Sequence, residues 1–212
     1  MKKLALLLCI LALSLILPAC TNKTPPKEQN PATAESAIDI SIPSEDKSIT
    51  KSQINEKIKL AATTILSGKI EVLIPESFAI MPDELLKIKY PLESRPTLVY
   101  TNESASVNVA FNYTENEATA EDLTEMLDLF INVFTDLYPS AQWYRTGIEM
   151  INERKVGVLE LVMPAEDTEI YNLIWFTELD GRLMMASFNC TIELEEEWKG
   201  VGIRILESFR VV

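Results

Sequence analysis

The chain contains no histidine among its 212 residues and only three cysteines. The absence of histidine excludes serine–histidine and cysteine–histidine nucleophile pairs, together with every zinc or iron site that has an imidazole ligand. Basic side chains are also scarce, with 19 lysines and arginines against 32 acidic residues and a net charge of −13. Nucleic-acid binding depends on basic side chains that neutralise phosphates, so this charge argues against a nucleic-acid partner.

Apolar runs of transmembrane length are missing as well. The run from Leu4 to Leu17 follows Lys2 and Lys3 and falls short of the ~20 residues that a transmembrane helix needs. A charged start, a short apolar core and a small residue before the cleavage point are typical of a signal peptide, predicted here at residues 1–19. The motif Leu17-Pro18-Ala19-Cys20 resembles the lipobox of bacterial lipoproteins. The alternative is an ordinary secretory signal that contains a cysteine.

The lipobox resemblance implies cleavage by signal peptidase II between Ala19 and Cys20, with a diacylglycerol thioether on Cys20. Two acyl chains give a stable anchor, whereas one gives only marginal membrane binding. We therefore expect the protein on the extracytoplasmic face of a bacterial membrane, with the membrane as a partner through Cys20. Thr21 is not the aspartate associated with inner-membrane retention, so both a single cell membrane and an outer membrane agree with the sequence.

Residues 20–55 are expected to form a disordered tether. The segment is rich in proline, threonine, serine, asparagine and glutamate and lacks aromatic residues. A flexible chain of about 30 residues would hold the following domain about 30 Å from the membrane. Once the leader is removed and Cys20 carries lipid, Cys190 is the one remaining thiol, and its apolar neighbours predict a small buried hydrophobic side chain.

Residues 56–212 are expected to form one α+β domain, an antiparallel meander β-sheet flanked by helices. Strands are expected at 61–66, 69–74, 97–101, 105–112, 142–151, 155–163, 169–177 and 182–190. Helices are expected at 48–59, 81–86, 120–138 and 192–208. The helix at 120–138 has an apolar stripe for the core, formed by Leu123, Leu127, Phe130, Phe134 and Leu137.

Two of the expected strands carry opposite patterns. The residues of 170–176 are apolar on both alternating faces, which predicts a central strand that is covered on both sides. In the strand at 105–112, apolar residues alternate with Asn108 and Asn112, which predicts one face exposed to water.

Several short sequence segments resemble those of proteins with the PsbP-like fold, an α/β/α sandwich, and within it the DcrB-type secreted bacterial lipoproteins. The segments are Gly68-Lys69-Ile70 to Ile74-Pro75 with Phe78, Tyr90-Pro91 with Arg95-Pro96-Thr97, Val107-Asn108-Val109-Ala110, and Ile170-Tyr171-Asn172 with Ser187-Phe188-Asn189-Cys190-Thr191. The resemblance covers about residues 60–212, judged from the pattern of expected strands and helices described above. It implies a non-catalytic accessory or binding protein. Photosystem members of this fold help to retain manganese and calcium, and a nuclear member binds a small GTPase. No ligand residue of either can be matched to a position of this chain.

An acidic cluster at the start of the last expected helix contains the metal-ligand candidates Glu193, Glu196 and Glu197. A calcium or manganese site needs several oxygens that converge on one point. Carboxylates at a helix start also interact favourably with the helix dipole and fan out around the axis, so we favour this structural interpretation over a metal site.

Tyr138, Trp143 and Tyr144 lie around Pro139, near a helix-to-strand turn. Exposed aromatic side chains there would suit a surface for a protein partner. Packing of the same rings into the core is the more common arrangement.

The sequence therefore favours a non-enzymatic, lipid-anchored binding or accessory protein of the cell envelope, with an envelope protein as its partner and no cofactor. The alternative, based on the acidic charge, is a binder of divalent cations such as calcium or manganese. A hydrolase is the third hypothesis, but the chain has neither histidine nor a nucleophile elbow.

Overall fold

The computed structural model describes residues 58–212. The predicted signal peptide at 1–19, the lipidation site Cys20 and the predicted tether at 20–55 lie outside the described residues. The strands are β1 (Leu60–Ile65), β2 (Ile70–Pro75), β3 (Ala79–Ile80), β4 (Leu98–Thr101), β5 (Val107–Glu117), β6 (Gln142–Ile151), β7 (Arg154–Pro164), β8 (Glu169–Leu179), β9 (Arg182–Thr191) and β10 (Arg210–Val211). The helices are η1 (Leu66–Gly68), α3 (Asp83–Lys89), α4 (Leu123–Leu137), η2 (Ile192–Leu194) and α5 (Glu195–Ser208).

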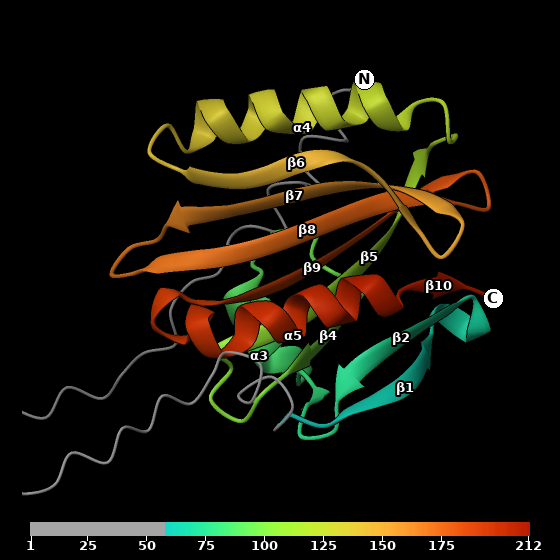
Figure 1. The fold of residues 1–212 in the computed structure, drawn as a ribbon. Helices are drawn as coiled ribbons and strands as arrows, with labels where there is room; N and C mark the ends of the chain where they lie inside the picture. The colour runs from blue at the N-terminus through green and yellow to red at the C-terminus, as the bar shows by residue number, and fades with distance from the viewer. Residues whose placement is uncertain (1–57) are drawn as a thin grey trace, which may run out of the picture.

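The main sheet has seven antiparallel strands in the order β3-β4-β5-β9-β8-β7-β6. It consists of two meanders, β3–β5 and β6–β9, which the pairing of β5 with β9 joins. Helix α4 follows β5 and leads the chain to β6 at the far edge of the sheet (Figure 1). This arrangement confirms the expected α+β fold with an antiparallel sheet and flanking helices, and it adds a seam between β5 and β9 that the sequence pattern did not predict.

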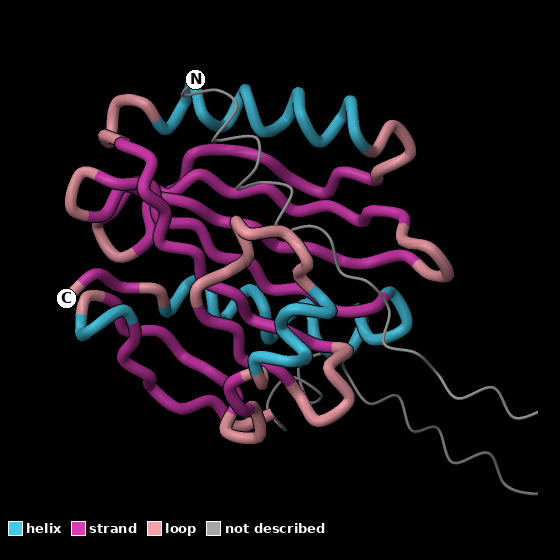
Figure 2. Tube along the Cα trace, turned by 180° about the vertical axis from the view of Figure 1, so that it is seen from behind, coloured by secondary structure: helices cyan, strands magenta, loops and turns pink. Residues whose placement is uncertain are grey.

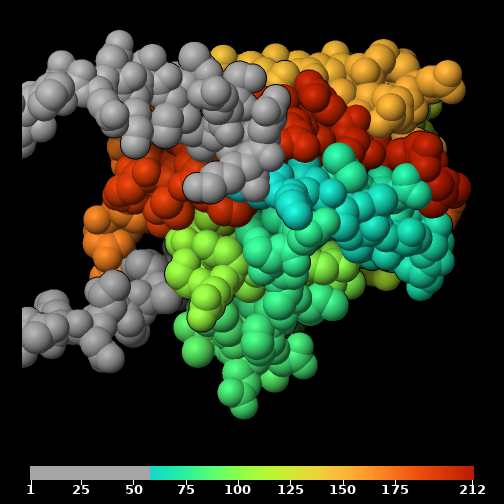
Figure 3. All heavy atoms as spheres, turned by 60° about the horizontal axis from the view of Figure 1, so that its bottom comes forward, coloured from blue at the N-terminus to red at the C-terminus, as the bar shows by residue number. Residues whose placement is uncertain are grey.

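A second, three-stranded sheet has the order β1-β2-β10. Its last strand comes from the end of the chain, where Arg210 pairs with Glu71 and Val211 pairs with Ile70. Figure 3 shows this small sheet beside α5 on one surface of the molecule. The two ends of the described chain are therefore joined through β2.

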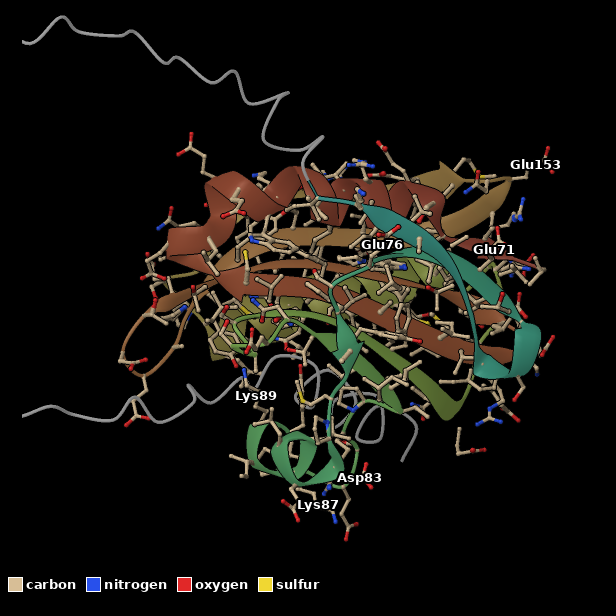
Figure 4. All side chains as sticks on the ribbon, turned by 90° about the horizontal axis from the view of Figure 1, so that it is seen from below. Glu71, Glu76, Asp83, Lys87, Lys89 and Glu153 are labelled. Atoms are coloured by element: carbon tan, nitrogen blue, oxygen red, sulfur yellow. The ribbon has the colours of Figure 1, made fainter. Side chains whose placement is uncertain are left out.

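The helices cover opposite faces of the main sheet. Helix α5 and the small sheet pack on one face, through a core that includes Val201 and Ile205 of α5. Helix α4 packs on the other face through Leu127 and Phe130, and α3 lies over the β4–β5 part of that same face. Figure 4, seen from below, shows α5 and α3 on opposite sides of the sheet. We call these two surfaces the α5 face and the α4 face.

Strand β8 lies inside the main sheet and is covered on both sides, as its sequence predicts. Tyr171, Leu173 and Trp175 belong to the core of the α5 face. Ile174 and Phe176 belong to the core of the α4 face. A continuous apolar strand thus identifies the middle of the sandwich.

Two sequence-based expectations about individual faces are wrong. Asn108 and Asn112 of β5 are buried, at 1% and 6% exposure, although their alternation with apolar residues predicted a wet face. Leu137, the last residue of the predicted stripe on α4, is 44% exposed because it lies at the end of the helix, beyond the part that packs on the sheet.

Helix α5 approaches the main sheet closely at one glycine. A Cβ atom at Gly202 would lie 2.5 Å from the ring of Phe188 on β9. The absence of a side chain at this position therefore sets the distance between the helix and the sheet. The described residues contain no helix that is long and apolar enough to cross a membrane.

Candidate functional site

Three asparagines lie side by side on the α4 face, one on each of three neighbouring strands. The strand register pairs Asn108 of β5 with Asn189 of β9, and Asn189 with Asn172 of β8. All three are at most 1% exposed. The Asn108 side-chain amide donates to Asn189 Oδ1 at 3.0 Å, and Thr101 Oγ1 donates to Asn108 Oδ1 at 2.7 Å. Strand pairing between distant segments thus places a row of amides in an otherwise apolar core.

Several buried polar atoms in and beside this row have no hydrogen-bond partner of ordinary geometry within the described part of the chain. They are Asn172 Oδ1 and Asn189 Nδ2, together with Ser187 Oγ and Tyr90 OH. Ser187 lies two residues before Asn189, so both side chains point to the α4 face. A buried donor or acceptor without a partner costs about 1–3 kcal/mol. Four such atoms in one place are a concentration that needs an explanation.

Lys89 and Tyr90, at the end of α3, complete the group. Lys89 is 3% exposed and its Nζ donates to the Ala105 carbonyl, which also accepts a 3.5 Å bond from the Asn108 amide. Figure 4 shows Lys89 on the side of α3 that faces the sheet, with Asp83 and Lys87 on the far side. Burial lowers the pKa of Lys89, and no ion pair joins it to an acidic residue within 58–212.

Tyr90 lies beside the asparagine row. Burial raises the pKa of the Tyr90 hydroxyl to about 12, and Asn189 acts in the opposite direction. The Asn189 amide acts as a hydrogen-bond donor toward this hydroxyl, so the two groups face each other, although their geometry lies outside that of an ordinary hydrogen bond. We call the group of Lys89, Tyr90, Asn108, Asn172, Ser187 and Asn189 the buried polar cluster.

The chemistry of the buried polar cluster suits binding. It offers one cationic donor, neutral amide and hydroxyl groups, and one unpartnered carbonyl oxygen. It holds no carboxylate or thiolate that could act as a base or nucleophile.

Figure 2 shows the face that carries α4 and α3, which lie over different parts of the sheet.

A second polar group on the α5 face has complete pairing. The carboxylate of Glu160 on β7 is 4% exposed and binds Arg145 Nε at 2.8 Å and Lys199 Nζ at 2.9 Å. Tyr171 OH donates to Glu160 Oε1 at 3.1 Å. Burial, followed by the charge of Glu160, raises the pKa of Tyr171. Lys199 Nζ also lies 3.6 Å from the ring centroid of Tyr144, a cation–π contact.

A bulge in β6 directs these side chains. The register between β6 and β7 shifts between Trp143, which pairs with Leu161, and Arg145, which pairs with Glu160. A bulge places one extra residue in a strand and re-aims its neighbours. Trp143 and Tyr144 point to opposite faces, as consecutive residues of a strand do, with Trp143 in the core of the α4 face. Because of the bulge, the next residue, Arg145, lies on the α5 face together with Tyr144, so both contact the group around Lys199 and Glu160. The result is a brace between β6, β7, β8 and α5, which we call the Glu160 network.

The structure does not gather the three aromatic residues of the predicted partner surface. Tyr138 and Trp143 are half-buried and pack around Phe134, with ring centroids 6.3 Å and 6.5 Å from its ring. Tyr144 is 44% exposed on the opposite face, and its hydroxyl donates to Glu195 at 3.3 Å.

The acidic candidates lie at the start of α5. Glu193 is in η2 and accepts a 3.1 Å hydrogen bond from Thr168, while Glu196 and Glu197 are exposed in the first turn of the helix. Within residues 58–212, no group of three or more acidic or cysteine side chains is arranged to hold a metal ion. Cys190 is buried, as predicted, and burial raises its pKa to about 12. Ala19 and Cys20 lie outside the described residues.

Sequence reasoning missed most of the buried polar cluster. A usable signal was present, because Asn172 and Asn189 each interrupt a strand that is otherwise largely apolar. Lys89 gave no such signal, since a lysine in the last turn of a helix is ordinarily a solvated residue near the negative end of the helix dipole. Glu160 likewise interrupts an apolar strand and was not singled out.

No protein-family model matches the sequence, and no curated protein is significantly similar to it. Among solved structures, the cyanobacterial PsbP protein of Synechocystis sp. PCC 6803, CyanoP, is similar with a TM-score of 0.53 and 13% identity. The similarity covers 73% of this chain and 94% of that one. It shows that this chain has the PsbP-like fold.

Weaker similarities extend to two other bacterial structures. LpqN of Mycobacterium tuberculosis, described as involved in cell envelope biogenesis, has a TM-score of 0.42 and 8% identity over 76% of this chain and 96% of that one. A protein of unknown function from Pseudomonas aeruginosa, PA94, has a TM-score of 0.41 and 9% identity over 70% of this chain and 94% of that one.

Proposed function

We propose that this protein is a lipid-anchored, extracytoplasmic, non-catalytic binding protein of the cell envelope, and that the buried polar cluster is its binding site. The observation that carries the proposal is a group of four buried polar atoms on one face of the sheet that have no hydrogen-bond partner of ordinary geometry among residues 58–212, next to a lysine that forms no ion pair within the same residues. Buried polar groups in folded proteins are nearly always satisfied. A bound molecule would supply the missing partners.

The location in the envelope rests on the leader. The lipobox at Leu17-Pro18-Ala19-Cys20 supports a lipid anchor, and the acidic domain that follows would be repelled by anionic headgroups rather than lie on them. A Cys20→Ala variant is expected to leave the membrane fraction and to lose metabolic labelling with palmitate. Retention of the variant in the membrane with full labelling would contradict the anchor.

The binding role can be tested on the intact lipoprotein. The full chain is purified from membranes in a mild detergent and measured by native mass spectrometry. A non-covalent small molecule is expected on the wild type and absent from Asn189→Leu, which removes the central amide of the cluster.

Asn112→Leu is the matched control for this measurement. Asn112 is also a buried amide on the α4 face of β5, but its amide donates to the Ser94 carbonyl at 3.2 Å and its oxygen accepts from Thr97 at 3.3 Å. This variant is expected to keep the bound molecule. A wild-type protein without any bound mass, or equal retention by Asn189→Leu, would contradict the proposal.

The accessory part of the proposal predicts an envelope protein as a partner. In-cell crosslinking of the anchored protein, followed by mass spectrometry, is expected to give a reproducible partner that the Cys20→Ala form captures less efficiently. A partner captured equally well without the anchor would show that attachment to the membrane plays no part in the interaction.

A further inference from the structure

Strand β6 forms one edge of the main sheet (Figure 1). Within residues 58–212 it pairs with β7 on one side, and no strand lies on its other side. Every second residue of an antiparallel strand directs its N–H and C=O groups outward, so this side of β6 presents a row of backbone donors and acceptors. With 10 residues, β6 is much longer than β3, the 2-residue strand at the opposite edge. An edge of this length can accept another strand and extend the sheet.

Two opposite charges lie on the regular part of β6, with a glycine between them. After the bulge, Arg145, Gly147 and Glu149 lie on the α5 face, and no other residue of β6 is charged. Arg145 Nε binds Glu160 at 2.8 Å, and Arg145 Nη1 binds Glu149 Oε1 at 3.0 Å. The Arg145 and Glu149 side chains are 38% and 32% exposed, so this pair remains accessible to a neighbouring molecule.

The positions of the two charges select one way to pair β6 with a second copy of itself. Opposed residues of an antiparallel ladder share a face, so the two-fold axis of such a pair passes through a residue position. An axis at Arg145 or at Glu149 would oppose like charges. An axis at Thr146 or at Ile148 would oppose neither charge to its opposite. An axis at Gly147 places Arg145 opposite the second copy's Glu149, and Glu149 opposite the second copy's Arg145.

The pairs between copies would join closer positions than the ion pair within one chain does. Along extended β6, Arg145 and Glu149 are about 13 Å apart at their Cα atoms, so their side chains must reach toward each other across Gly147. Directly opposed residues of neighbouring strands have Cβ atoms about 4.5–5.5 Å apart, and opposite charges there are stabilising. Arg145 keeps Glu160 through Nε, which leaves Nη1 for the second copy's Glu149.

We propose that two copies of this chain associate through β6, in an antiparallel pair centred on Gly147 that joins their main sheets into one continuous sheet. The two-fold axis is perpendicular to this sheet, so both α5 faces lie on the same side and the four charges of Arg145 and Glu149 surround the axis. The inference concerns assembly and does not depend on what the buried polar cluster binds.

Cysteine crosslinking of the full lipoprotein in membranes tests the register. Gly147→Cys places two thiols directly opposite each other at the axis, so a short bis-maleimide is expected to give a covalent dimer. Met150→Cys is the matched control, because Met150 is 63% exposed on the same strand but would lie about 20 Å from its counterpart in the second copy. Equal crosslinking of the two variants, or none in Gly147→Cys, would overturn the proposal.

Gly147→Lys tests the association without a crosslink. A Cβ atom at Gly147 would meet no described atom within 4 Å, so the fold has room for a side chain, and an unchanged Tm would verify this. Two lysines would oppose each other at the axis, and sedimentation velocity on the detergent-solubilised full chain is expected to show at least ten-fold weaker dimerisation. Gly147→Thr is the matched control and should keep the dimer, because threonine is uncharged and suits a strand.

Two results of this second experiment would contradict the dimer. One is equal dimerisation of the lysine and threonine variants, and the other is a wild-type protein that is monomeric at every concentration measured. If the wild type is monomeric and Gly147→Lys loses an envelope partner in the in-cell crosslinking experiment, the edge of β6 binds a different protein and the pairing of two copies is refuted.

Discussion

On the α5 face of the main sheet, the buried carboxylate of Glu160 has three partners, whereas on the α4 face four buried polar atoms have no partner of ordinary hydrogen-bond geometry among the residues that the structure describes. The same strands supply both sets, since β8 and β9 present residues to both faces in alternation. The α5 face also contains one buried polar group without a hydrogen-bond partner among residues 58–212, the indole N–H of Trp175, whose ring packs edge-on against Phe111. The two faces thus differ in the concentration of unpaired groups rather than in the mere burial of polar atoms.

This difference separates a structural role from a binding role. A fully satisfied network makes a core rigid and specific, whereas partly satisfied networks cost stability unless another molecule completes them. We therefore interpret the Glu160 network as a brace and the buried polar cluster as a site. Substitutions on the two faces should have effects of different size and opposite sign on the free energy of unfolding.

The largest effect is expected for Glu160→Leu, which removes the acceptor shared by Arg145 and Lys199. Both cations keep a second counter-charge, Glu149 for Arg145 and Glu195 for Lys199. The expected loss is therefore that of hydrogen bonds to a buried charged acceptor, about 1.5–3 kcal/mol each. Urea unfolding monitored by tryptophan fluorescence measures this loss. Glu149→Leu is the control, because Glu149 has a side chain 32% exposed and should change stability by less than about 1 kcal/mol. Similar losses in both variants would mean that Glu160 is not the centre of the brace.

Gly202→Ala tests how tightly α5 packs on the sheet. The new Cβ would meet the Phe188 ring at 2.5 Å, so either the ring or the helix must shift. Overpacking of this kind costs about 1–3 kcal/mol even though alanine is the better helix former. Thermal unfolding should show a lower Tm, and an unchanged or higher Tm would show that the α5 face has room to adjust.

Cys190 on β9 allows a test of whether water reaches the core on the α5 face, through the pH dependence of the free energy of unfolding. Burial, followed by Glu195 and Glu193, raises its pKa from 9.0 to about 12, so the folded state keeps a proton that the unfolded state loses in this range. The contribution to stability is complete below pH 9 and is lost as the pH approaches 12, at about 1.4 kcal/mol per pH unit. Cys190→Ala should lack this part of the slope, and identical slopes from pH 9 upward would show that the thiol is hydrated.

Ser187→Ala should have the smallest effect and the opposite sign. The hydroxyl has no hydrogen-bond partner from residue 58 onward, so its removal should leave the free energy of unfolding unchanged or raise it by up to about 1 kcal/mol. Thr101→Val is the matched control, because that hydroxyl donates to Asn108 at 2.7 Å and its loss should cost about 1 kcal/mol. If Ser187→Ala is as destabilising as Thr101→Val in urea unfolding, the contrast between the two faces fails.

Most of the fold could be predicted from the sequence because its elements have strong local patterns. The strand predicted at 142–151 is β6, Gln142–Ile151, and the central position of β8 follows from its two apolar faces. The pairing of β5 with β9 could not be predicted in this way, because it joins segments with 64 residues between them and depends on the path of α4.

The candidate site was harder to predict because alternation does not show what covers a face. The pattern around Asn108 separates two faces of β5 correctly, but the polar one is covered by Tyr90 and its neighbours from a distant helix. Trp143 and Tyr144 lie on opposite faces because consecutive residues of a strand alternate, and the bulge that follows places Arg145 on the same face as Tyr144, which the residue pattern did not predict. A polar residue in an otherwise apolar strand should therefore be considered as a buried side chain before it is predicted to lie on a solvent-exposed face.

The seam between β5 and β9 also determines when the buried polar cluster can form. Asn108 and Asn189 are 81 residues apart in sequence, whereas the meander from β6 to β9 folds through short turns. Long-range pairings form late because chain closure must precede the contacts that reward it. Pulse-labelled hydrogen exchange should therefore show protection of the β7 and β8 amides before those of β5. If the buried polar cluster is the binding site, as proposed, the site forms only when the last strands join, so that every binding-competent molecule is also a completely folded one.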